Sequence, residues 1–195
     1  GAVKWTFNPV PQSAGDPAYA EWSPEAARGT GHANVWTPLS VDKERGLVFA
    51  PTSSPSPDYY GGNRLGDNRY ANAVVALDAE TGAVVWDFQT VHHDVWDYDL
   101  PSQPGLYQVW RDGEAHDVVV QTTKTGLVFV LDRDTSAPFL PIEERAVPQG
   151  SVDGEQLSPT QPFPVATPPI VPSDIEPGEA FGITIWDKMA CRNKF

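Results

Sequence analysis

The chain has 195 residues, with 26 Asp and Glu against 13 Lys and Arg, and a net charge of −13. This acidity argues against nucleic acid or an anionic membrane surface as a partner, because both are bound through basic patches. No apolar run approaches the ~18 residues of a membrane span. The lone Cys191 excludes an internal disulfide and a cysteine-rich zinc site. Twenty prolines and sixteen glycines disfavour long helices and favour short strands joined by turns.

The first half of the chain predicts one four-stranded unit. A polar stretch at 9–31 comes first, with a short helix expected at 24–28. A loop at 51–70, rich in Pro, Ser, Gly and Asn, interrupts the apolar runs, and a loop of this length is typically functional or disordered. The four predicted strands are 35–41, 46–50, 73–78 and 83–88.

A repeated motif indicates the architecture. An apolar strand, an Asp-x-x-Thr-Gly turn at Asp78 and a second strand ending in Trp86 form the clear copy. A weaker copy has its aspartate at Asp132, 54 positions later, and residues 1–5 match the tail of a third copy. Trp5 and Trp86, which end the motif, are interpreted as residues that dock neighbouring units. Such recurrence predicts propeller blades of four antiparallel strands.

The second half is less regular. A second blade is expected at about 105–141, with its clearest strands at 117–122 and 126–132. The proline-rich stretch at 148–177 is expected to be an extended, wrapping segment or a flexible one. Because propellers need roughly four to eight blades, we expect an all-β partial β-propeller of about two blades, with 1–195 a fragment of a single longer domain. Unpaired blade edges favour a dimer or a larger oligomer.

The densest cluster of reactive side chains lies at 92–99. It holds two imidazoles, three carboxylates and two large aromatic rings within eight residues. Carboxylates this close raise one another's pKa unless a cation or hydrogen-bond donors offset them. The cluster directly follows the run at 73–88, so it is expected at the end of a sheet, where loops carry function.

The segment FQTVHHDVWDYD at 88–99 resembles the active-site segment of the PQQ-dependent (quinoprotein) dehydrogenases, specifically the membrane-bound glucose dehydrogenase type. Further matching segments follow the family's order from about 31 to 163, and CR at 191–192 also matches. They are WTPLS (36–40), YGGNR (60–64), TKTG (123–126), VLDR (130–133), VPQG (147–150) and LSPTQPF (157–163). The resemblance implies an eight-bladed propeller with PQQ over its central channel, of which this chain carries about a third.

The same resemblance assigns roles to individual residues. Asp97 matches the catalytic base that takes the substrate hydroxyl proton while hydride passes to PQQ. Lys124, 27 positions later, matches the lysine that contacts the quinone oxygens. Trp36 matches the floor on which the cofactor stacks, and Ser56 falls where the family often has a threonine bonded to PQQ.

A divalent cation, expected to be calcium, is the second implied cofactor. Asp97, Asp99 and Ser54 are its candidate ligands in this chain. Ser54 stands where the family has an asparagine, and a hydroxyl is a poorer calcium ligand than an amide carbonyl. The cation site is therefore either altered or completed by residues outside the chain. His92 and His93 are candidates for contacting the substrate or the residues around it.

The leading interpretation is part of a bacterial periplasmic dehydrogenase that oxidises an aldose or polyol and passes electrons to a quinone. The resemblance to the membrane-bound type is compatible with an anchor in the bacterial inner membrane, carried by the complete protein. Taken alone, Asp97 is also typical of an exposed turn, Lys124 of a solvated hairpin and Trp36 of blade docking.

Two alternatives belong to other classes of protein. One is a non-catalytic propeller that serves as a scaffold or binding module, which has no reason to keep both Asp97 and Lys124. The other is a carbohydrate-binding β domain that uses the exposed aromatic residues Tyr59, Tyr60 and Trp110.

Overall fold

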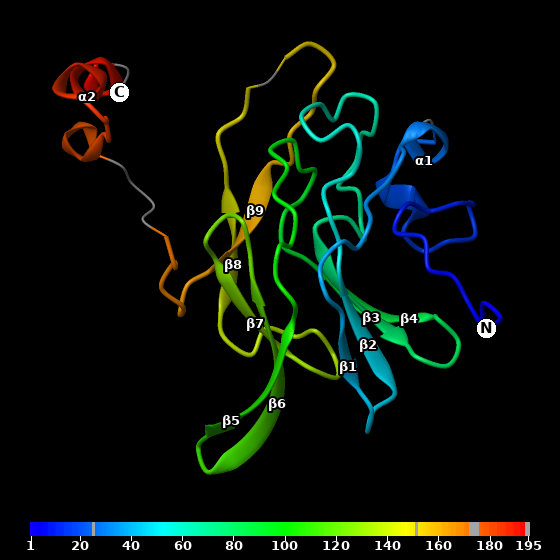
Figure 1. Cartoon of the computed structure of the whole chain (residues 1–195). Coiled ribbons are helices and arrows are strands. Elements are labelled where there is room, and N and C mark those ends of the chain that lie inside the picture. Colours follow the sequence, from blue (N-terminus) through cyan, green and yellow to red (C-terminus); the bar gives the residue numbers. More distant parts are fainter. Residues whose placement is uncertain (25, 151, 172–175, 194–195) are drawn as a thin grey trace.

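The computed structural model describes residues 1–24, 26–150, 152–171 and 176–193, whose strands form three antiparallel sheets (Figure 1). In each sheet, strands that follow one another along the chain are neighbours. The first sheet consists of β1 (Ser40–Asp42), β2 (Leu47–Pro51), β3 (Ala73–Asp78) and β4 (Val84–Gln89). The second consists of β5 (Gly105–Arg111), β6 (Glu114–Thr122) and β7 (Val128–Asp132), and the third of β8 (Ile142–Ala146) and β9 (Thr160–Pro164).

The helices are short. Near the N-terminus lie the 3-10 helix η1 (Tyr19–Glu21) and α1 (Ala26–Gly29), the latter at the place where a short helix was expected, although position 25 lies outside the described residues. Toward the other end lie η2 (Pro177–Glu179) and α2 (Ile185–Arg192), which the sequence did not predict. None of the helices in the described part of the chain combines the length and the apolar character needed to span a bilayer.

The first sheet is the predicted four-stranded blade, with one difference. The strand expected at 35–41 is reduced to β1, which begins at Ser40. Pro38 has no N–H to give to a ladder, and the Thr37 hydroxyl donates instead to the carbonyl of Leu100. The segment before β1 therefore follows the loop after β4 rather than a neighbouring strand.

The second blade is incomplete. Its fourth strand is represented by a single bridge between Leu131 and Pro138, because the prolines around this point cannot continue a ladder. The hairpin of β8 and β9 was not predicted. β9 lies within the proline-rich stretch at 148–177, of which positions 151 and 172–175 lie outside the described residues. Proline is tolerated in β9 because this strand pairs on one side only.

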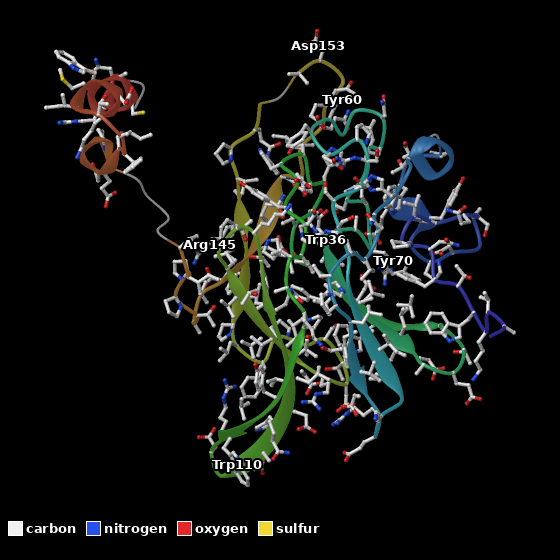
Figure 2. All side chains as sticks on the ribbon, viewed as in Figure 1. Trp36, Tyr60, Tyr70, Trp110, Arg145 and Asp153 are labelled. Carbon is white, nitrogen blue, oxygen red and sulfur yellow. The ribbon has the colours of Figure 1, made fainter. Side chains whose placement is uncertain are left out.

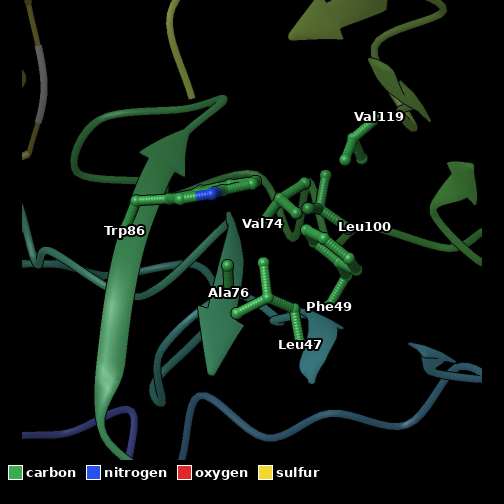
Figure 3. Packing of buried hydrophobic residues seen from close by; sticks show 7 residues of the cluster. All are labelled: Leu47, Phe49, Val74, Ala76, Trp86, Leu100 and Val119. Atoms are coloured by element: carbon green, nitrogen blue, oxygen red, sulfur yellow. The ribbon is translucent and has the colours of Figure 1, made fainter. Parts of the chain in front are cut away.

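The main hydrophobic core lies between the first two sheets (Figure 3). Strand β3 is buried on both faces, which explains the imperfect alternation of its sequence. Its Val74 and Ala76 join the core that faces β6, and its Val75 and Leu77 pack against the N-terminal segment around Phe7. The main core contains Leu47, Phe49, Val74, Ala76, Trp86, Leu100 and Val119.

The two copies of the sequence motif form the same turn. Asp78 Oδ1 accepts a hydrogen bond from the N–H of Thr81 at 2.7 Å, and Asp132 Oδ1 accepts one from the N–H of Thr135 at 2.9 Å. Each threonine hydroxyl also donates to its aspartate at 2.7 Å. The weakened copy therefore retains the side chains that hold the turn closed.

The motif tryptophans dock on these turns. Trp5 Nε1 donates to the carbonyl of Ala79 at 3.1 Å, and Trp86 Nε1 donates to the carbonyl of Arg133 at 3.0 Å. Both acceptors are the first residue after the motif aspartate. Gly82, at φ +74°, leaves room for Trp5, because a Cβ at this position would meet the indole at 2.5 Å. Each tryptophan thus joins one copy of the motif to the next.

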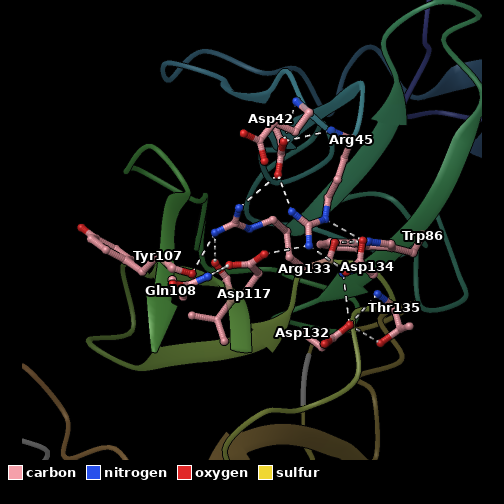
Figure 4. A network of polar contacts seen from close by, with 12 residues as sticks. Asp42, Arg45, Trp86, Tyr107, Gln108, Asp117, Asp132, Arg133, Asp134 and Thr135 are labelled. Atoms are coloured by element: carbon pink, nitrogen blue, oxygen red, sulfur yellow. Dashed lines mark hydrogen bonds and ion pairs between the residues drawn. The ribbon is translucent and has the colours of Figure 1, made fainter. Parts of the chain in front are cut away.

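A charged network joins the first two sheets away from the core (Figure 4). Arg45, in the turn between β1 and β2, contacts Asp42 at 3.1 Å, Asp117 of β6 at 2.8 Å and Asp134 at 2.7 Å. Arg133 contacts the same Asp42 at 3.0 Å. The two arginines therefore connect the sheets by polar contacts as well as by packing.

Candidate active site

The candidate residues come from one end of the two larger sheets. In an antiparallel meander, the residues before β1 and those after β2, β4 and β6 all lie at the same end. Trp36, Ser54, the 90–99 loop and Lys124 occupy these positions. Trp110, near the turn between β5 and β6, lies at the opposite end (Figure 2).

Lys124 brings the two predicted carboxylates together. Its Nζ lies 3.2 Å from Asp97 Oδ2, 3.1 Å from Asp99 Oδ2 and 2.8 Å from the carbonyl of Asp97. The side chains of Lys124 and Asp97 are 31% and 33% exposed, so the pair is reachable from solvent. Burial opposes the charged ammonium, but hydrogen bonds to Asp99 and Asp97 outweigh it and raise the pKa of Lys124 above its usual value.

The turn that carries Lys124 is held by its neighbours. The N–H of Gly126 donates to the carbonyl of Thr123 at 3.0 Å, and the N–H of Leu127 donates to the Thr123 hydroxyl at 3.2 Å. Gly126 has φ +76°, a conformation that glycine adopts without steric cost. Lys124 therefore projects from a closed turn at the end of β6.

Asp99 connects the cluster to Trp36 and Ser54. Trp36 Nε1 donates to Asp99 Oδ2 at 3.1 Å, and the backbone N–H of Ser54 donates to Asp99 Oδ1 at 2.6 Å. Both carboxylate oxygens are thus engaged, which fixes the orientation of Asp99. Trp36 remains 53% exposed, so part of its indole surface is available for another flat molecule.

The loop that carries Asp97 has an unusual backbone. Asp97 has φ +59° and His93 has φ +46°, a region that few residues other than glycine adopt. Trp96 and Tyr98, on either side of Asp97, stack with ring centroids 5.8 Å apart. Both rings line an apolar hollow of about 740 Å³, whereas Asp97 and Asp99 face Lys124. The loop therefore separates a polar cluster from an apolar hollow.

A buried aspartate that had been assigned no role of its own organises this loop. Asp94 is only 1% exposed, and its carboxylate accepts hydrogen bonds from the N–H groups of Trp96 and Tyr98 and from Asn72 Nδ2. Burial raises the pKa of Asp94 above its usual value, and the hydrogen bonds only partly oppose this shift. The only signal in the sequence was an aspartate two residues before Trp96, a spacing at which its side chain can reach the backbone.

Arg64 is the second organising residue to which no role was assigned. It is 0% exposed, and its guanidinium donates to the carbonyl of Pro57 at 3.0 Å, to Asn68 Oδ1 at 2.8 Å and to the carbonyl of Asp94. Burial lowers its pKa, although nearby carboxylates oppose the shift. The only indication of this role in the sequence was a basic residue in the long loop between β2 and β3. The sequence does not show whether that residue is buried.

The two histidines bind groups outside the Lys124 cluster. His92 Nε2 lies 3.2 Å from Glu144 Oε1 on β8, which ties the loop to the third sheet. His93 is buried, with Nδ1 2.7 Å from the carbonyl of Gly66 and Nε2 2.9 Å from Glu155 Oε1. The structure therefore places both imidazoles in contacts that hold neighbouring segments against the loop.

Ser56 is not brought together with Lys124 and Asp97. It lines a separate hollow of about 450 Å³ with residues that include Ser23, Thr30 and Asn63. Its predicted contact with PQQ therefore gains no support from its position.

The residues present make an incomplete metal site. Within the described ranges, no three His, Cys, Asp or Glu side chains are grouped to hold a metal ion. Asp97 and Asp99 already share the Lys124 ammonium, whereas calcium takes 6–8 oxygen ligands. Among the residues that the structure describes, the buried Ser54 hydroxyl has no hydrogen-bond partner, although it lies near enough to Asp94 to lower the pKa of that carboxyl. A cation at this place would need ligands beyond those described.

The cluster fits a flat quinone cofactor better. Trp36 offers a partly exposed aromatic face, and Lys124 lies beside it through their shared contact with Asp99. Planar aromatic surfaces supply packing for a polycyclic ligand, and an ammonium suits oxygen atoms that become negatively charged. The donor set is therefore compatible with PQQ.

Comparisons with known proteins show which family the chain resembles. Residues 1–195 match the family model described as PQQ: glucose/ethanol/alcohol dehydrogenase, β-propeller domain. The chain is 39% identical over 197 residues to the quinoprotein glucose dehydrogenase of Escherichia coli (strain K12), covering 100% of this chain and 24% of that protein. It is 42% identical over 172 residues to the glycerol dehydrogenase large subunit of Gluconobacter thailandicus, covering 87% and 23%.

The chain is also similar in fold to a solved structure. The quinohemoprotein alcohol dehydrogenase from Comamonas testosteroni superposes with a TM-score of 0.63 at 26% identity, over 84% of this chain and 26% of that one. The chain thus spans about a quarter of the length of these relatives. The predicted all-β partial propeller and the predicted resemblance are confirmed. Because the family model covers the chain from end to end, this protein belongs to the glucose/ethanol/alcohol dehydrogenase β-propeller family.

Proposed function

We propose that this chain supplies part of the active site of a PQQ-dependent dehydrogenase that oxidises a hydroxyl group of an aldose or polyol. The contact of Lys124 Nζ with the carboxylates of Asp97 and Asp99, next to the exposed Trp36, carries the proposal. A non-catalytic scaffold does not need an ammonium and two carboxylates in contact at one end of its sheets.

Each residue of the cluster has a role in this proposal. Trp36 would present its flat face to the cofactor, and Lys124 would stabilise negative charge on its oxygens. PQQ, when bound, would be the oxidant that accepts a hydride from the substrate. Asp99 would hold Trp36 and Lys124 in place through Oδ2, while its Oδ1 is fixed by the N–H of Ser54.

Asp97 would act as the general base. Its carboxylate is one third exposed and lies 3.2 Å from the Lys124 ammonium, so a substrate hydroxyl can reach it and donate its proton to it. A proton removed at the hydroxyl oxygen makes the departure of hydride from the same carbon easier. The backbone conformation of Asp97 directs the carboxylate toward Lys124.

The remaining parts of the proposal rest on the family. The relatives are named as dehydrogenases of glucose and glycerol, which favours a hydroxyl-rich substrate here. We propose a quinone as the electron acceptor, calcium as a second cofactor held partly by residues beyond those described, and a periplasmic location. Association through open blade edges also stays a proposal.

The carbohydrate-binding alternative is not favoured. Trp110 lies near the turn between β5 and β6, and Tyr60 lies in the loop between β2 and β3, at the other end of the sheets (Figure 2). The Tyr60 hydroxyl already donates to the carbonyl of Asp153 at 3.2 Å. These aromatic residues therefore do not form one sugar-binding surface.

The test is Asp97→Asn in the protein that carries this chain, reconstituted with PQQ and calcium and assayed by dye reduction with glucose and with glycerol. We expect kcat to fall about 10²–10⁴-fold, the contribution of a general base, while PQQ still binds. Asp112→Asn is the matched control, because Asp112 has a similar φ of +53° but lies in the turn between β5 and β6. Asparagine tolerates this conformation, so both variants keep the backbone.

Two results would contradict the proposal. Full activity of Asp97→Asn would exclude Asp97 as the base. Absence of PQQ binding to the unmodified protein would favour the scaffold alternative.

A further inference from the structure

One buried carboxylate binds the peptide groups on both sides of Asp97. Asp94 Oδ1 accepts the N–H of Trp96 at 2.9 Å, and Asp94 Oδ2 accepts the N–H of Tyr98 at 2.6 Å. These are the residues immediately before and after Asp97, which itself has φ +59°. We infer that Asp94 is a positioning residue that holds Asp97 in its reactive orientation, an inference that rests on the proposed function.

The chemistry of the contact requires a carboxylate. An ionised carboxylate only accepts hydrogen bonds and has two oxygens, so it can accept from two separate N–H groups at once. An asparagine at position 94 would have one oxygen and would place an NH₂ group against the second N–H. Two donors would then face each other, and one side of the loop around Asp97 would lose its anchor.

Asp94 is itself firmly held. Asn72, directly before β3, donates from Nδ2 to Asp94 Oδ2 at 2.8 Å. The buried Arg64 donates to the main-chain carbonyl of Asp94. A rigid sheet and a buried cation thus fix the carboxylate, and the carboxylate fixes the loop.

The expected consequence is catalytic rather than structural. Displacing a reacting group by about 1 Å can cost about 10²-fold in rate. Trp36 is held by Asp99, and Lys124 keeps its own contact with Asp99, although it also contacts the carbonyl of Asp97 in one of the peptides that Asp94 binds. Loss of Asp94 should therefore lower kcat and leave PQQ affinity and KM nearly unchanged.

The test is Asp94→Asn in the protein reconstituted with PQQ and calcium. We expect kcat to fall about 100-fold, with KM and PQQ affinity changed less than about threefold. Asp132→Asn is the control, because Asp132 also accepts two backbone N–H groups, those of Asp134 and Thr135, but through one oxygen that asparagine retains and in the turn after β7. A kcat for Asp94→Asn equal to that of Asp132→Asn would overturn the inference.

A double variant separates this inference from the proposed function. If Asp94 acts through Asp97, then adding Asp94→Asn to Asp97→Asn should lower kcat no further. A further fall of 100-fold would overturn the inference. Activity retained by Asp97→Asn alone would instead refute the proposed base, whereas loss there with full kcat in Asp94→Asn would refute only the positioning role.

Hydrogen exchange of the cofactor-free protein gives a readout that does not depend on turnover. The amides of Trp96 and Tyr98 should exchange faster in Asp94→Asn and at the normal rate in Asp97→Asn, and unchanged exchange in Asp94→Asn would overturn the inference.

If Asp94→Asn does not fold, Asn72→Gly removes the side-chain donor to Asp94 while tolerating φ +48°. It should lower kcat about tenfold, as expected for one hydrogen bond to a charged group, and an unchanged kcat would count against the inference.

Discussion

At the scale of single residues, buried polar groups decide the shape of the loops around the site. Arg64 is fully buried and satisfies acceptors from three places in the chain: Pro57, Asn68 and Asp94. A buried acceptor that loses its donor costs about 1–3 kcal/mol. The loop between β2 and β3 is therefore held by polar contacts where few apolar side chains are available.

Arg64→Met should lower the free energy of unfolding by about 3 kcal/mol, because two buried acceptors, on Asn68 and Asp94, lose their donor. Urea unfolding followed by tryptophan fluorescence would measure the loss. Arg111→Met is the control, since the exposed Arg111 lies over the ring of Phe139 at 3.9 Å and should contribute about 1 kcal/mol or less. Equal losses in the two variants would show that the buried contacts of Arg64 add nothing.

At the scale of elements, the repeated turn and its tryptophan form the unit of assembly. Trp86 at the end of one motif packs against Phe49 with ring centroids 5.6 Å apart and donates to the carbonyl of Arg133 in the next turn. The indole thus combines apolar burial with one directed hydrogen bond. This combination explains why a tryptophan, rather than another aromatic residue, ends the motif.

Trp86→Phe should destabilise the protein by about 1–3 kcal/mol, because the carbonyl of Arg133 loses its donor and the core loses part of a ring. Trp110→Phe, near the tip of the hairpin of β5 and β6, should change stability by less than about 0.5 kcal/mol because Trp110 is 72% exposed. Chemical unfolding of the two variants side by side checks the difference, and a neutral Trp86→Phe would argue against tryptophan docking.

At the scale of the whole molecule, charge holds the first two sheets together beside the core. A hydrogen bond from Arg45 lowers the pKa of Asp117. Burial acts to raise the pKa of Asp42, but hydrogen bonds from Arg45 and Arg133 outweigh it, so the net shift is also downward. For both carboxyls the pKa in the folded protein lies below the pKa in the unfolded chain, which is about 3.9. Their stabilisation is therefore complete above that pH and is lost as the pH falls through the folded pKa.

The free energy of unfolding should thus decline below about pH 4. Arg45→Met should cost about 1 kcal/mol at pH 6 and less at pH 2, because the stabilisation is lost as the pH falls toward the folded pKa of Asp42 and Asp117. Lys4→Met serves as the control, because the pair of Lys4 and Glu80 is 3.7 Å apart and well exposed. An Arg45→Met effect that is independent of pH would show that the arginine acts through packing alone.

The sequence by itself determined three of the four strands of the first blade and the Asp-x-x-Thr turns, and the resemblance assigned Lys124, Asp97 and Asp99 to one site without predicting that their side chains contact one another. These features depend on local patterns or on motifs that lie at one end of the same meander. They also sufficed to indicate the family, because matching segments recur in order along the chain.

The tertiary structure alone decided the roles of Asp94 and Arg64, the directions of His92 and His93, and the hairpin of β8 and β9. The physical reason is that positive φ angles in the 90–99 loop redirect its side chains, so alternation along a strand no longer predicts which way they face. Burial of a charged residue depends likewise on segments distant in the chain. Whether Asp94 or Arg64 meets water or a backbone group is settled only when those segments pack.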